Sequence, residues 1–230
     1  MKKKLVVLSG AGVSAESGVA TFRDAGGLWE GHNVMEVASP EGFRKNPELV
    51  LDFYNKRRRQ LFEVSPNKAH TTIAGMEDTF DVTVITQNVD DLHERAGSTK
   101  VLHLHGELVK ARCTQCETAV IDWKGDITIG TLHPKTGKQL RPHIVWFGEA
   151  VPAITQAMEI VKQADCLIVI GTSLQVYPAA GLVDYVKPDT PIYYIDPNPA
   201  QIPKLCNPLE VIAMKGSVGM EVVKKKMLLK

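Results

Sequence analysis

The sequence lacks the features that mark several special classes of protein. Its 230 residues contain no apolar stretch that approaches the length of a membrane span, and 27 basic against 26 acidic side chains leave a net charge of +1. A charge so near zero gives no general attraction to nucleic acid or to an anionic membrane. Four cysteines, two of them in an isolated CxxC pair, are too few for a disulfide framework. We therefore expect a cytoplasmic protein that binds neither nucleic acid nor membranes.

Two segments mimic signals of other kinds. The start, MKKKLVVLSG, resembles the beginning of a signal peptide, but its apolar run stops after four residues and glycines follow, which favours a first β-strand. The longest basic runs, 57–59 and 224–226, lie in helical patterns. Such runs are more often solvated faces than binding tails.

Short apolar, β-branched runs alternate with helical patterns along most of the chain. The predicted strands are 4–9, 82–86, 101–104, 166–170, 191–195 and 210–213, and the predicted helices include 47–64, 68–78, 154–163 and 179–186. This alternation is typical of an α/β fold with a Rossmann-like, doubly wound parallel sheet. We assign residues 1–24, 76–106 and 147–230 to that domain. Residues 25–75, with helices but no strand, and the polar residues 107–146 are predicted to form a smaller inserted lobe.

A glycine-rich turn follows the first predicted strand directly. Gly10, Gly12 and Ala15 fit the pattern G-x-G-x-x-G/A, in which backbone N–H groups approach a pyrophosphate. A turn with only a packing role is about as common. The acid expected roughly 20 residues further on would be Glu30, in a loop-like segment, whereas Asp196 follows a strand much later. The pattern therefore indicates a bound dinucleotide but not hydride transfer.

Three more predicted strands end in polar residues. These ends are Gln87-Asn88-Val89-Asp90, His105-Gly106 and Gly171-Thr172-Ser173. Any one of them alone would be explained by a turn or a helix cap. In open α/β sheets, however, ligands bind beyond the carboxyl ends of the strands. Together with the glycine turn, the clusters therefore predict one binding site.

Five motifs, in this order, make the sequence recognisable: GAGVSAESGVATFR, TQNVDDLH, HLHG, IVWFGE and GTSLQVYP. They resemble the sirtuin family of NAD-dependent protein deacylases, and the likeness runs from about residue 5 to residue 218. The resemblance implies a Rossmann-like domain with a small lobe and a substrate cleft between them. It also implies that NAD is consumed while an acyl-lysine protein or peptide is converted to free lysine, nicotinamide and O-acyl-ADP-ribose.

The resemblance also implies roles for individual residues. His105 would be the general base, for which the ordinary histidine pKa of about 6.5 is suitable. Residues 145–149 of the fourth motif would form a wall of the acyl-lysine tunnel and pair with the substrate backbone, with Val145, Phe147, Gly148 and Glu149 as substrate-binding residues. The family usually has asparagine where this chain has Asp196. Residues expected to bind NAD are Gly10, Ala11, Gly12, Ser14, Phe22, Arg23, Trp29, Gln87, Asn88, Asp90, Gly171, Thr172, Ser173, Asp196, Asn198 and Val218.

The expected zinc site of this family is incomplete. Cys113 and Cys116 form half of a structural ligand set, but the second cysteine pair of the sirtuin pattern is absent, so that 107–146 is a degenerate zinc-ribbon-like segment. His133 and His143 are the remaining candidates, and a Cys2His2 site is the alternative. We predict no metal. His93 and His103 are interpreted as structural, since a lone strand histidine is more often structural than catalytic.

Tyr54 and Arg57 stand three residues apart in the apolar stripe of helix 47–64, which also contains Val50, Phe53, Leu61 and Val64. An arginine reaching out of an amphipathic helix into solvent is the common explanation. A Tyr-x-x-Arg pair in this place, however, is typical of the sirtuin subgroup that prefers succinyl- and malonyl-lysine. The resemblance therefore predicts that the pair binds the carboxylate of the acyl group. The small residues at 25–27 would leave room for a longer group.

Parts of the sequence are compatible with functions other than deacylation. The same cofactor site could serve protein ADP-ribosyl transfer, or a catalytically silent sensor of NAD or ADP-ribose. A metal hydrolase could use His103, His105, Cys113 and Cys116. The presence of Asn88, Asp90 and His105 favours an active deacylase, which we predict to desuccinylate and demalonylate, with deacetylation as a further activity. Nothing in the sequence demands a dimer, and we expect a monomer.

Overall fold

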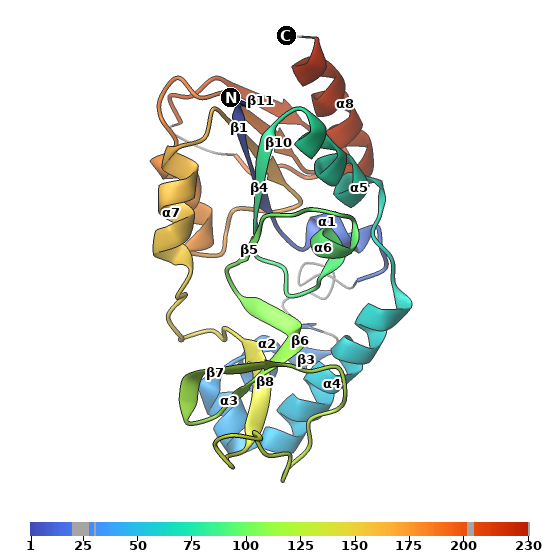
Figure 1. Cartoon of the computed structure of the whole chain (residues 1–230), viewed down its shortest axis with the longest axis vertical. Helices are drawn as coiled ribbons and strands as arrows, with labels where there is room; N and C mark the ends of the chain where they lie inside the picture. The colour runs from blue at the N-terminus through green and yellow to red at the C-terminus, as the bar shows by residue number, and fades with distance from the viewer. Residues whose placement is uncertain (20–27, 30, 202–204, 230) are drawn as a thin grey trace.

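Six parallel strands form the central sheet of the molecule (Figure 1). The structure is a computed structural model that describes residues 1–19, 28–29, 31–201 and 205–229. Across the sheet the order is β11-β10-β9-β1-β4-β5, so that the chain builds outward from β1 on one side and then from β9 on the other. This is the predicted doubly wound α/β topology. The strands are β1 (Lys4–Ser9), β4 (Asp81–Thr86), β5 (Val101–His103), β9 (Cys166–Ile170), β10 (Ile192–Ile195) and β11 (Leu209–Ile212).

Both faces of this sheet are buried. Along β1, Leu5 and Val7 pack into a core with helices α5 (Lys68–Gly75) and α8 (Gly216–Leu228). Val6 and Leu8 face the other way, against α7 (Ile154–Lys162) and the 3-10 helix η2 (Ala179–Tyr185). Figure 1 shows α7 on one side of the strands and α5 with α8 on the other. Burial on both faces explains why these strands are continuous apolar runs.

A second, antiparallel sheet lies at the other end of the molecule, in the lower half of Figure 1. Its strands β6 (Gly106–Cys113), β7 (Cys116–Asp122) and β8 (Leu140–Ile144) are ordered β7-β6-β8. Gly106 links it to the end of β5 with φ of +81°, and a Cβ there would lie 2.0 Å from the carbonyl oxygen of His143. Only glycine fits this junction. Helices α2 (Val34–Val37), α3 (Pro40–Lys45) and α4 (Pro47–Glu63) lie in the same half.

The predicted strands are confirmed to within one residue at each end. Predicted helix 179–186 is instead the 3-10 helix η2. Residues 25–75, which were expected to lack strands, contain a short antiparallel pair of strands, β2 (Leu28–Trp29) and β3 (His32–Asn33). These strands are too short to leave an alternating pattern in the sequence. Helix α5 packs on the large sheet through Ala69 and Ile73, although it was assigned to the smaller lobe. The other proposed boundaries stay predictions. The remaining elements are α1 (Gly12–Ala15), the 3-10 helix η1 (Met76–Asp78) and α6 (Leu92–Arg95).

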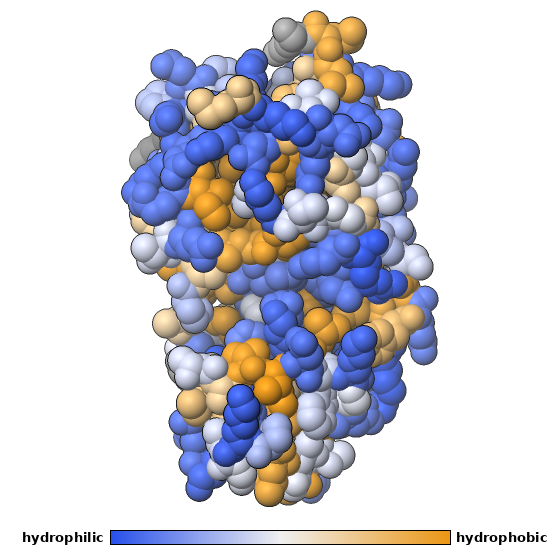
Figure 2. Space-filling model, viewed as in Figure 1, coloured by the Kyte–Doolittle hydropathy of each residue, from blue (hydrophilic) through white to orange (hydrophobic). Residues whose placement is uncertain are grey.

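The surface is mixed in character. On the face shown in Figure 2, hydrophilic side chains separate smaller hydrophobic patches, one over the upper half and one over the lower half that carries the three-stranded sheet. None of the described helices is long and apolar enough to cross a membrane.

Candidate active site

A cavity of about 720 Å³ lies at the carboxyl ends of the parallel strands, where the order of the sheet reverses. The four predicted clusters converge on it, because the turns after β1, β4 and β9 and the residue His105 after β5 all line it. A site at this point of an open α/β sheet is expected from the topology. Its volume lies within the range of about 300–1,000 Å³ that is usual for ligand sites.

Most residues predicted for the site line this cavity. They are Gly10, Ala11, Gly12, Ser14, Trp29, Tyr54, Arg57, Gln87, Asn88, Asp90, His105, Val145, Phe147, Gly148, Glu149, Gly171, Thr172, Ser173, Asp196 and Asn198. Val218 is not among the lining residues and is 54% exposed on α8, where Lys215 and Gly216 line the cavity instead. Phe22, Arg23 and residues 25–27 lie outside the described residues.

The glycine turn after β1 packs closely against the turn after β9. A Cβ on Gly12 would lie 2.8 Å from Gly171 Cα, and a Cβ on Gly10 would lie 2.7 Å from Thr172 Cβ. The Gly10 N–H donates to Ile170 O at 3.0 Å, and the Gly12 N–H donates to Gly171 O at 2.8 Å. These two amides therefore hold the β1 turn against the β9 turn, and they are not available to a pyrophosphate as the sequence pattern suggested.

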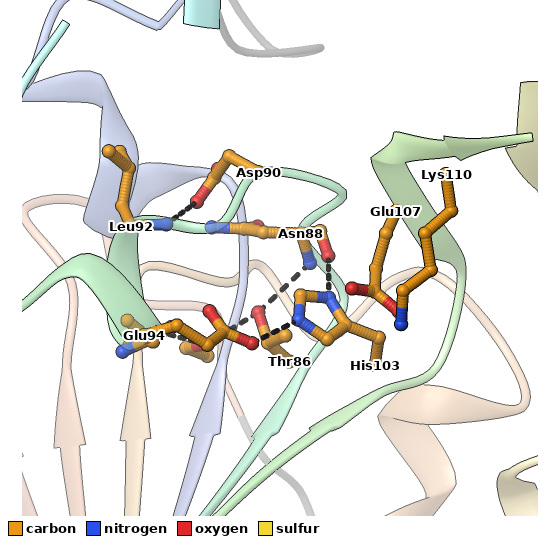
Figure 3. A network of polar contacts seen from close by, with 10 residues as sticks. Thr86, Asn88, Asp90, Leu92, Glu94, His103, Glu107 and Lys110 are labelled. Carbon is orange, nitrogen blue, oxygen red and sulfur yellow. Dashed lines mark hydrogen bonds and ion pairs between the residues drawn. The ribbon is translucent and has the colours of Figure 1, made fainter. Parts of the chain in front are cut away.

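A buried polar network occupies the turn after β4 (Figure 3). Asn88 Nδ2 donates to Ser14 Oγ at 2.9 Å, and Ser14 Oγ in turn donates to Asp90 Oδ2 at 2.9 Å. The Leu92 N–H donates to Asp90 Oδ1 at 3.2 Å. Burial raises the pKa of Asp90 against these hydrogen bonds, which lower it. The network fixes three side chains that line the cavity.

His105 is held as a neutral base. Its Nδ1 lies 3.0 Å from the carbonyl oxygen of Gln87. A carbonyl only accepts, so Nδ1 carries the proton, and the lone pair of the neutral ring is on Nε2. Burial lowers the pKa of His105 below its ordinary value. The residue is therefore suited to accept a proton from a ligand in the cavity that it lines.

His103 makes the same backbone contact but has a different partner. Its Nδ1 lies 3.0 Å from Asn88 O, while its Nε2 lies 2.7 Å from Glu94 Oε1 (Figure 3). Both acceptors require a proton, which makes His103 an imidazolium. Burial opposes this charge, but the hydrogen bond and charge of Glu94 raise the pKa of His103. His103 thus supports the Asn88 turn, in keeping with its predicted structural role.

The buried face of α4 contributes two side chains to the wall of the cavity. Asn46 caps the helix by accepting from the Leu49 N–H, with Pro47 in the first turn. Tyr54 is fully buried and Arg57 is only 6% exposed, and both line the cavity. The Arg57 guanidinium lies 4.4 Å from the ring centre of Trp29 and 5.7 Å from that of Phe53. Burial excludes an arginine that reaches into solvent.

Residues 145–149 line the cavity from the small sheet. The Val145 N–H donates to His105 O, and the Phe147 N–H donates to Ala38 O, both at 2.9 Å. The Glu149 carboxylate accepts from Arg112, from Arg141 and from the Trp146 N–H, at 2.7 to 3.1 Å. These bonds make Glu149 an anchor for the loop, and its predicted contact with substrate stays a prediction.

The CxxC hairpin is tied together by a threonine. Thr136 Oγ1 donates to Cys113 Sγ at 3.4 Å, and the Thr136 N–H donates to His133 Nδ1 at 3.2 Å. His143 lies in β8. Within the part of the chain that the structure describes, no three His, Cys, Asp or Glu side chains gather as metal ligands. The absence of zinc stays a prediction.

Trp146 lies in the predicted wall of residues 145–149, but its own role could not be predicted from the sequence. Its Nε1 donates to Tyr54 Oη at 3.0 Å. This partner lies 92 residues away in the chain. The lining residues Ala38, Leu108 and Ile144 were not predicted, because as single apolar residues they carry no signal that separates a cavity wall from a core.

Comparisons with known proteins add to this geometry. A family model described as the Sir2 family matches residues 10–178. An NAD-dependent protein deacylase of Helicobacter pylori is 63% identical over 195 residues, covering 85% of each chain. A protein with the same name from Bacteroides thetaiotaomicron is 49% identical over 238 residues, covering 97% of each. Among solved structures, a mutant Sir2 homologue in complex with ADP-ribose has a TM-score of 0.87 at 41% identity, covering 100% of this chain and 95% of that one. A complex of a Sir2 homologue with NAD has a TM-score of 0.86 at 42% identity, covering 100% and 91%.

Proposed function

The chain belongs to the Sir2 family and is an NAD-dependent protein deacylase, and we propose that it prefers acyl groups that end in a carboxylate, such as succinyl and malonyl. The observation that carries the proposal is the burial of Arg57 beside Tyr54 in the wall of the cavity that also contains His105. Acetyl-lysine, which is smaller and uncharged, would be a poorer substrate.

The residues present fit NAD. The cavity is large enough for a dinucleotide, and it offers the hydrogen-bonding groups of Asn88, Asp90, Thr172 and Ser173 along the ends of the strands. When bound, NAD supplies a ribose carbon that becomes electrophilic as nicotinamide leaves. Asn88 and Asp90, which Ser14 holds in place, would bind the ribose and the amide of the nicotinamide. Asp196 and Asn198 would contact the adenosine side, where the Asn198 N–H already donates to Asp196 Oδ1.

His105 would remove the proton that the reaction must lose. Its Nε2 carries the lone pair, because Nδ1 donates to Gln87 O. A ribose hydroxyl within hydrogen-bond distance of Nε2 would become a better nucleophile as the proton moves to the ring. The lowered pKa of His105 keeps the ring unprotonated at neutral pH, as a base must be.

Arg57 and Tyr54 would hold the far end of the acyl group. A guanidinium can donate two parallel hydrogen bonds to a carboxylate, and a phenol can add a third. Burial raises the pKa of Tyr54, so that its hydroxyl keeps its proton and stays a donor. Attraction between Arg57 and an acyl carboxylate is strong here because little water reaches either group. An acetyl group has no acceptor at this end.

The exposed edge near the cavity would bind the peptide that carries the lysine. Phe147 is 42% exposed, and Gly148 has open space where a side chain would be. Because the amides of Val145 and Phe147 already donate within the protein, pairing with a peptide would rely on their carbonyl groups. The monomeric state and the cytoplasmic location stay predictions.

One lysine peptide in acetylated and succinylated forms tests the proposal, with nicotinamide release and deacylated peptide followed with and without NAD. We expect NAD-dependent turnover with the succinylated form preferred. Arg57→Ala should lower kcat/KM for the succinylated peptide by about 30-fold or more, as for a buried charge pair that loses one partner, and much less for the acetylated one. Arg59→Ala is the matched control, since Arg59 belongs to the same helix but lies on the surface, where it pairs with Asp126. Turnover of acetyl alone, or equal losses for both peptides in Arg57→Ala, would contradict the proposal.

A further inference from the structure

We propose that Trp146 determines acyl selectivity by orienting the hydroxyl of Tyr54, a role that rests on the carboxylate-binding function proposed above. Trp146 is 2% exposed and donates its indole N–H to Tyr54 Oη at 3.0 Å. It is a positioning residue, since it acts on the acyl group through Tyr54. This links the loop that would bind the peptide to the pair that would bind the acyl carboxylate.

The direction of this hydrogen bond is fixed by chemistry. An indole N–H can only donate, so Tyr54 Oη is the acceptor. The hydroxyl proton of Tyr54 is therefore not used on Trp146 and must be directed elsewhere. Tyr54 lines the cavity together with Arg57, which lies one turn further along α4. Because Trp146 donates to the oxygen of Tyr54 from one side, the O–H of Tyr54 can donate to a ligand in the cavity, near the guanidinium of Arg57.

The ring packing holds Tyr54 in this orientation. Its ring makes edge contacts with Phe53 at 5.1 Å and Trp29 at 6.4 Å between ring centres. Its side chain is fully buried, and burial raises its pKa, so the donor proton is retained at any physiological pH. Among the described residues, the hydrogen bond that the structure shows at Tyr54 Oη is the one from Trp146.

Trp146 is itself fixed from outside the acyl site. The guanidinium carbon of Arg141 lies 3.3 Å from the centre of its ring, and the ring of Phe43 lies 5.2 Å away. Its backbone N–H donates to Glu149 Oε2 at 2.8 Å, and Glu149 in turn pairs with Arg112 and Arg141. An orientation that is set before substrate arrives costs no ordering entropy on binding. Arg112, Arg141 and Glu149 therefore fix the indole of Trp146, and the indole in turn orients Tyr54 in the proposed carboxylate site.

Selectivity follows because the two acyl groups differ only at this end. A succinyl or malonyl carboxylate can accept from the oriented hydroxyl and from Arg57, whereas an acetyl methyl group can accept from neither. Loss of the indole N–H leaves Tyr54 free to turn its proton away from the ligand. The loss should therefore weaken binding of carboxylate-bearing acyl groups more than it weakens acetyl binding.

Trp146→Phe tests this, because it keeps an aromatic ring and removes the N–H. We expect its KM for the succinylated peptide to rise about fivefold to tenfold, the effect of one hydrogen bond of about 1 kcal/mol, with a smaller change for the acetylated peptide. Trp123→Phe is the matched control: among the described residues, the buried Trp123 indole N–H has no acceptor. It should leave the ratio of the two kcat/KM values unchanged.

A double-mutant cycle gives the sharper test. In a Tyr54→Phe background, Trp146→Phe should have no further effect on the ratio, because the hydroxyl that it orients is gone. An undiminished effect there, or an equal loss for both peptides in Trp146→Phe alone, would overturn the inference. If Arg57→Ala abolishes the preference for the succinylated peptide but Trp146→Phe does not change it, the role of Trp146 is overturned and the proposed function is kept. No succinyl preference in the wild-type protein would instead defeat the proposed function.

The test does not depend on Trp146→Phe folding. Tyr54→Phe removes the acceptor and keeps all the rings, so the NMR resonance of one indole N–H should shift strongly in that variant. The same resonance should shift in the wild-type protein on binding a succinylated peptide, and less on binding the acetylated one. If no indole resonance shifts in Tyr54→Phe or on binding the succinylated peptide, the inference is contradicted.

Discussion

Replacing Glu94 by glutamine should remove a pH-dependent part of the protein's stability. In the wild-type protein, His103 donates from Nδ1 to Asn88 O and from Nε2 to Glu94 Oε1 (Figure 3). The His103 side chain is 8% exposed and that of Glu94 is 39% exposed. Glutamine keeps an oxygen at this place that can accept from Nε2, but it removes the negative charge. The variant therefore isolates the charge of the pair from its hydrogen bond.

The magnitude follows from the exposure of the two groups. A hydrogen bond to a charged group contributes about 1.5–3 kcal/mol when well buried, and an exposed ion pair contributes about 0.2–1 kcal/mol. Because Glu94 is more than a third exposed, solvent screens the pair, and we expect a loss of about 1 kcal/mol near pH 6. Glu107 also faces His103, but it is paired with Lys110 at 2.7 Å.

The sign of the pH dependence is set by the raised pKa of His103. A group whose pKa is higher in the folded state contributes stability that is fully present below its unfolded pKa of about 6.5. That stability is lost as the pH rises through the folded pKa. The lowered pKa of Glu94 acts in the opposite sense and matters only in acid, near its usual value of 4.5. The difference between wild type and variant should thus be largest near pH 6 and should shrink toward about pH 9.

Urea unfolding of both proteins at these two pH values measures the difference directly. Glu77→Gln is the control, because Glu77 accepts from the N–H and hydroxyl of Thr99 and, within the described part of the chain, has no histidine partner. Its effect should not depend on pH in this range. An equal loss of unfolding free energy at both pH values in Glu94→Gln would show that His103 is not an imidazolium in the folded protein.

Three further predictions concern the base, the junction between the sheets and the CxxC hairpin. His105→Gln should lower kcat by about 100-fold or more, and an unchanged kcat would show that His105 is not the base. Because burial lowers the pKa of His105, the wild-type rate should fall only below about pH 6.5. Gly106→Ala should cost about 2 kcal/mol or more in thermal unfolding, since a Cβ would lie 2.0 Å from His143 O at a φ of +81°, whereas Gly125→Ala, with open space, should cost little. Protein purified without chelator should contain well below one zinc per chain, and a chelator should leave its melting temperature unchanged; near-stoichiometric zinc would contradict this.

Much of the large sheet could be predicted because its strands are buried on both faces. Residues 5–8 and 166–170 are unbroken apolar runs, and the structure buries each of them between two layers of helices. The site could be located for a related reason, since the ends of parallel strands meet at one edge. The three-stranded sheet was not predicted as a sheet, because polar residues interrupt its strands and β8 pairs with β6 across a long intervening segment.

Roles within the site were harder to predict because partners decide them. His103 and His105 are two residues apart in one motif and make the same bond to neighbouring carbonyls. Only the approach of Glu94 makes one of them a cation, and nothing in their spacing shows this. The amides of Gly10 and Gly12 fit a phosphate-binding pattern, yet their acceptors come from the end of β9 and the turn that follows it, far along the chain.

The run Arg57-Arg58-Arg59 shows how one pattern divides into three functions. A basic run in a helix favours a solvated face, and only Arg57 was singled out from it for a role in the site. Successive residues of a helix point about 100° apart and meet different surroundings. Arg59 is the solvated one, paired with Asp126 at 2.6 Å. Arg58 is 1% exposed and donates to Leu108 O and Asn55 Oδ1, which ties α4 to the small sheet. Arg57 alone of the three lines the cavity, against aromatic rings. The helix must bury this side to fold, and the positive charge of Arg57 on that side is the basis of the carboxylate site proposed above.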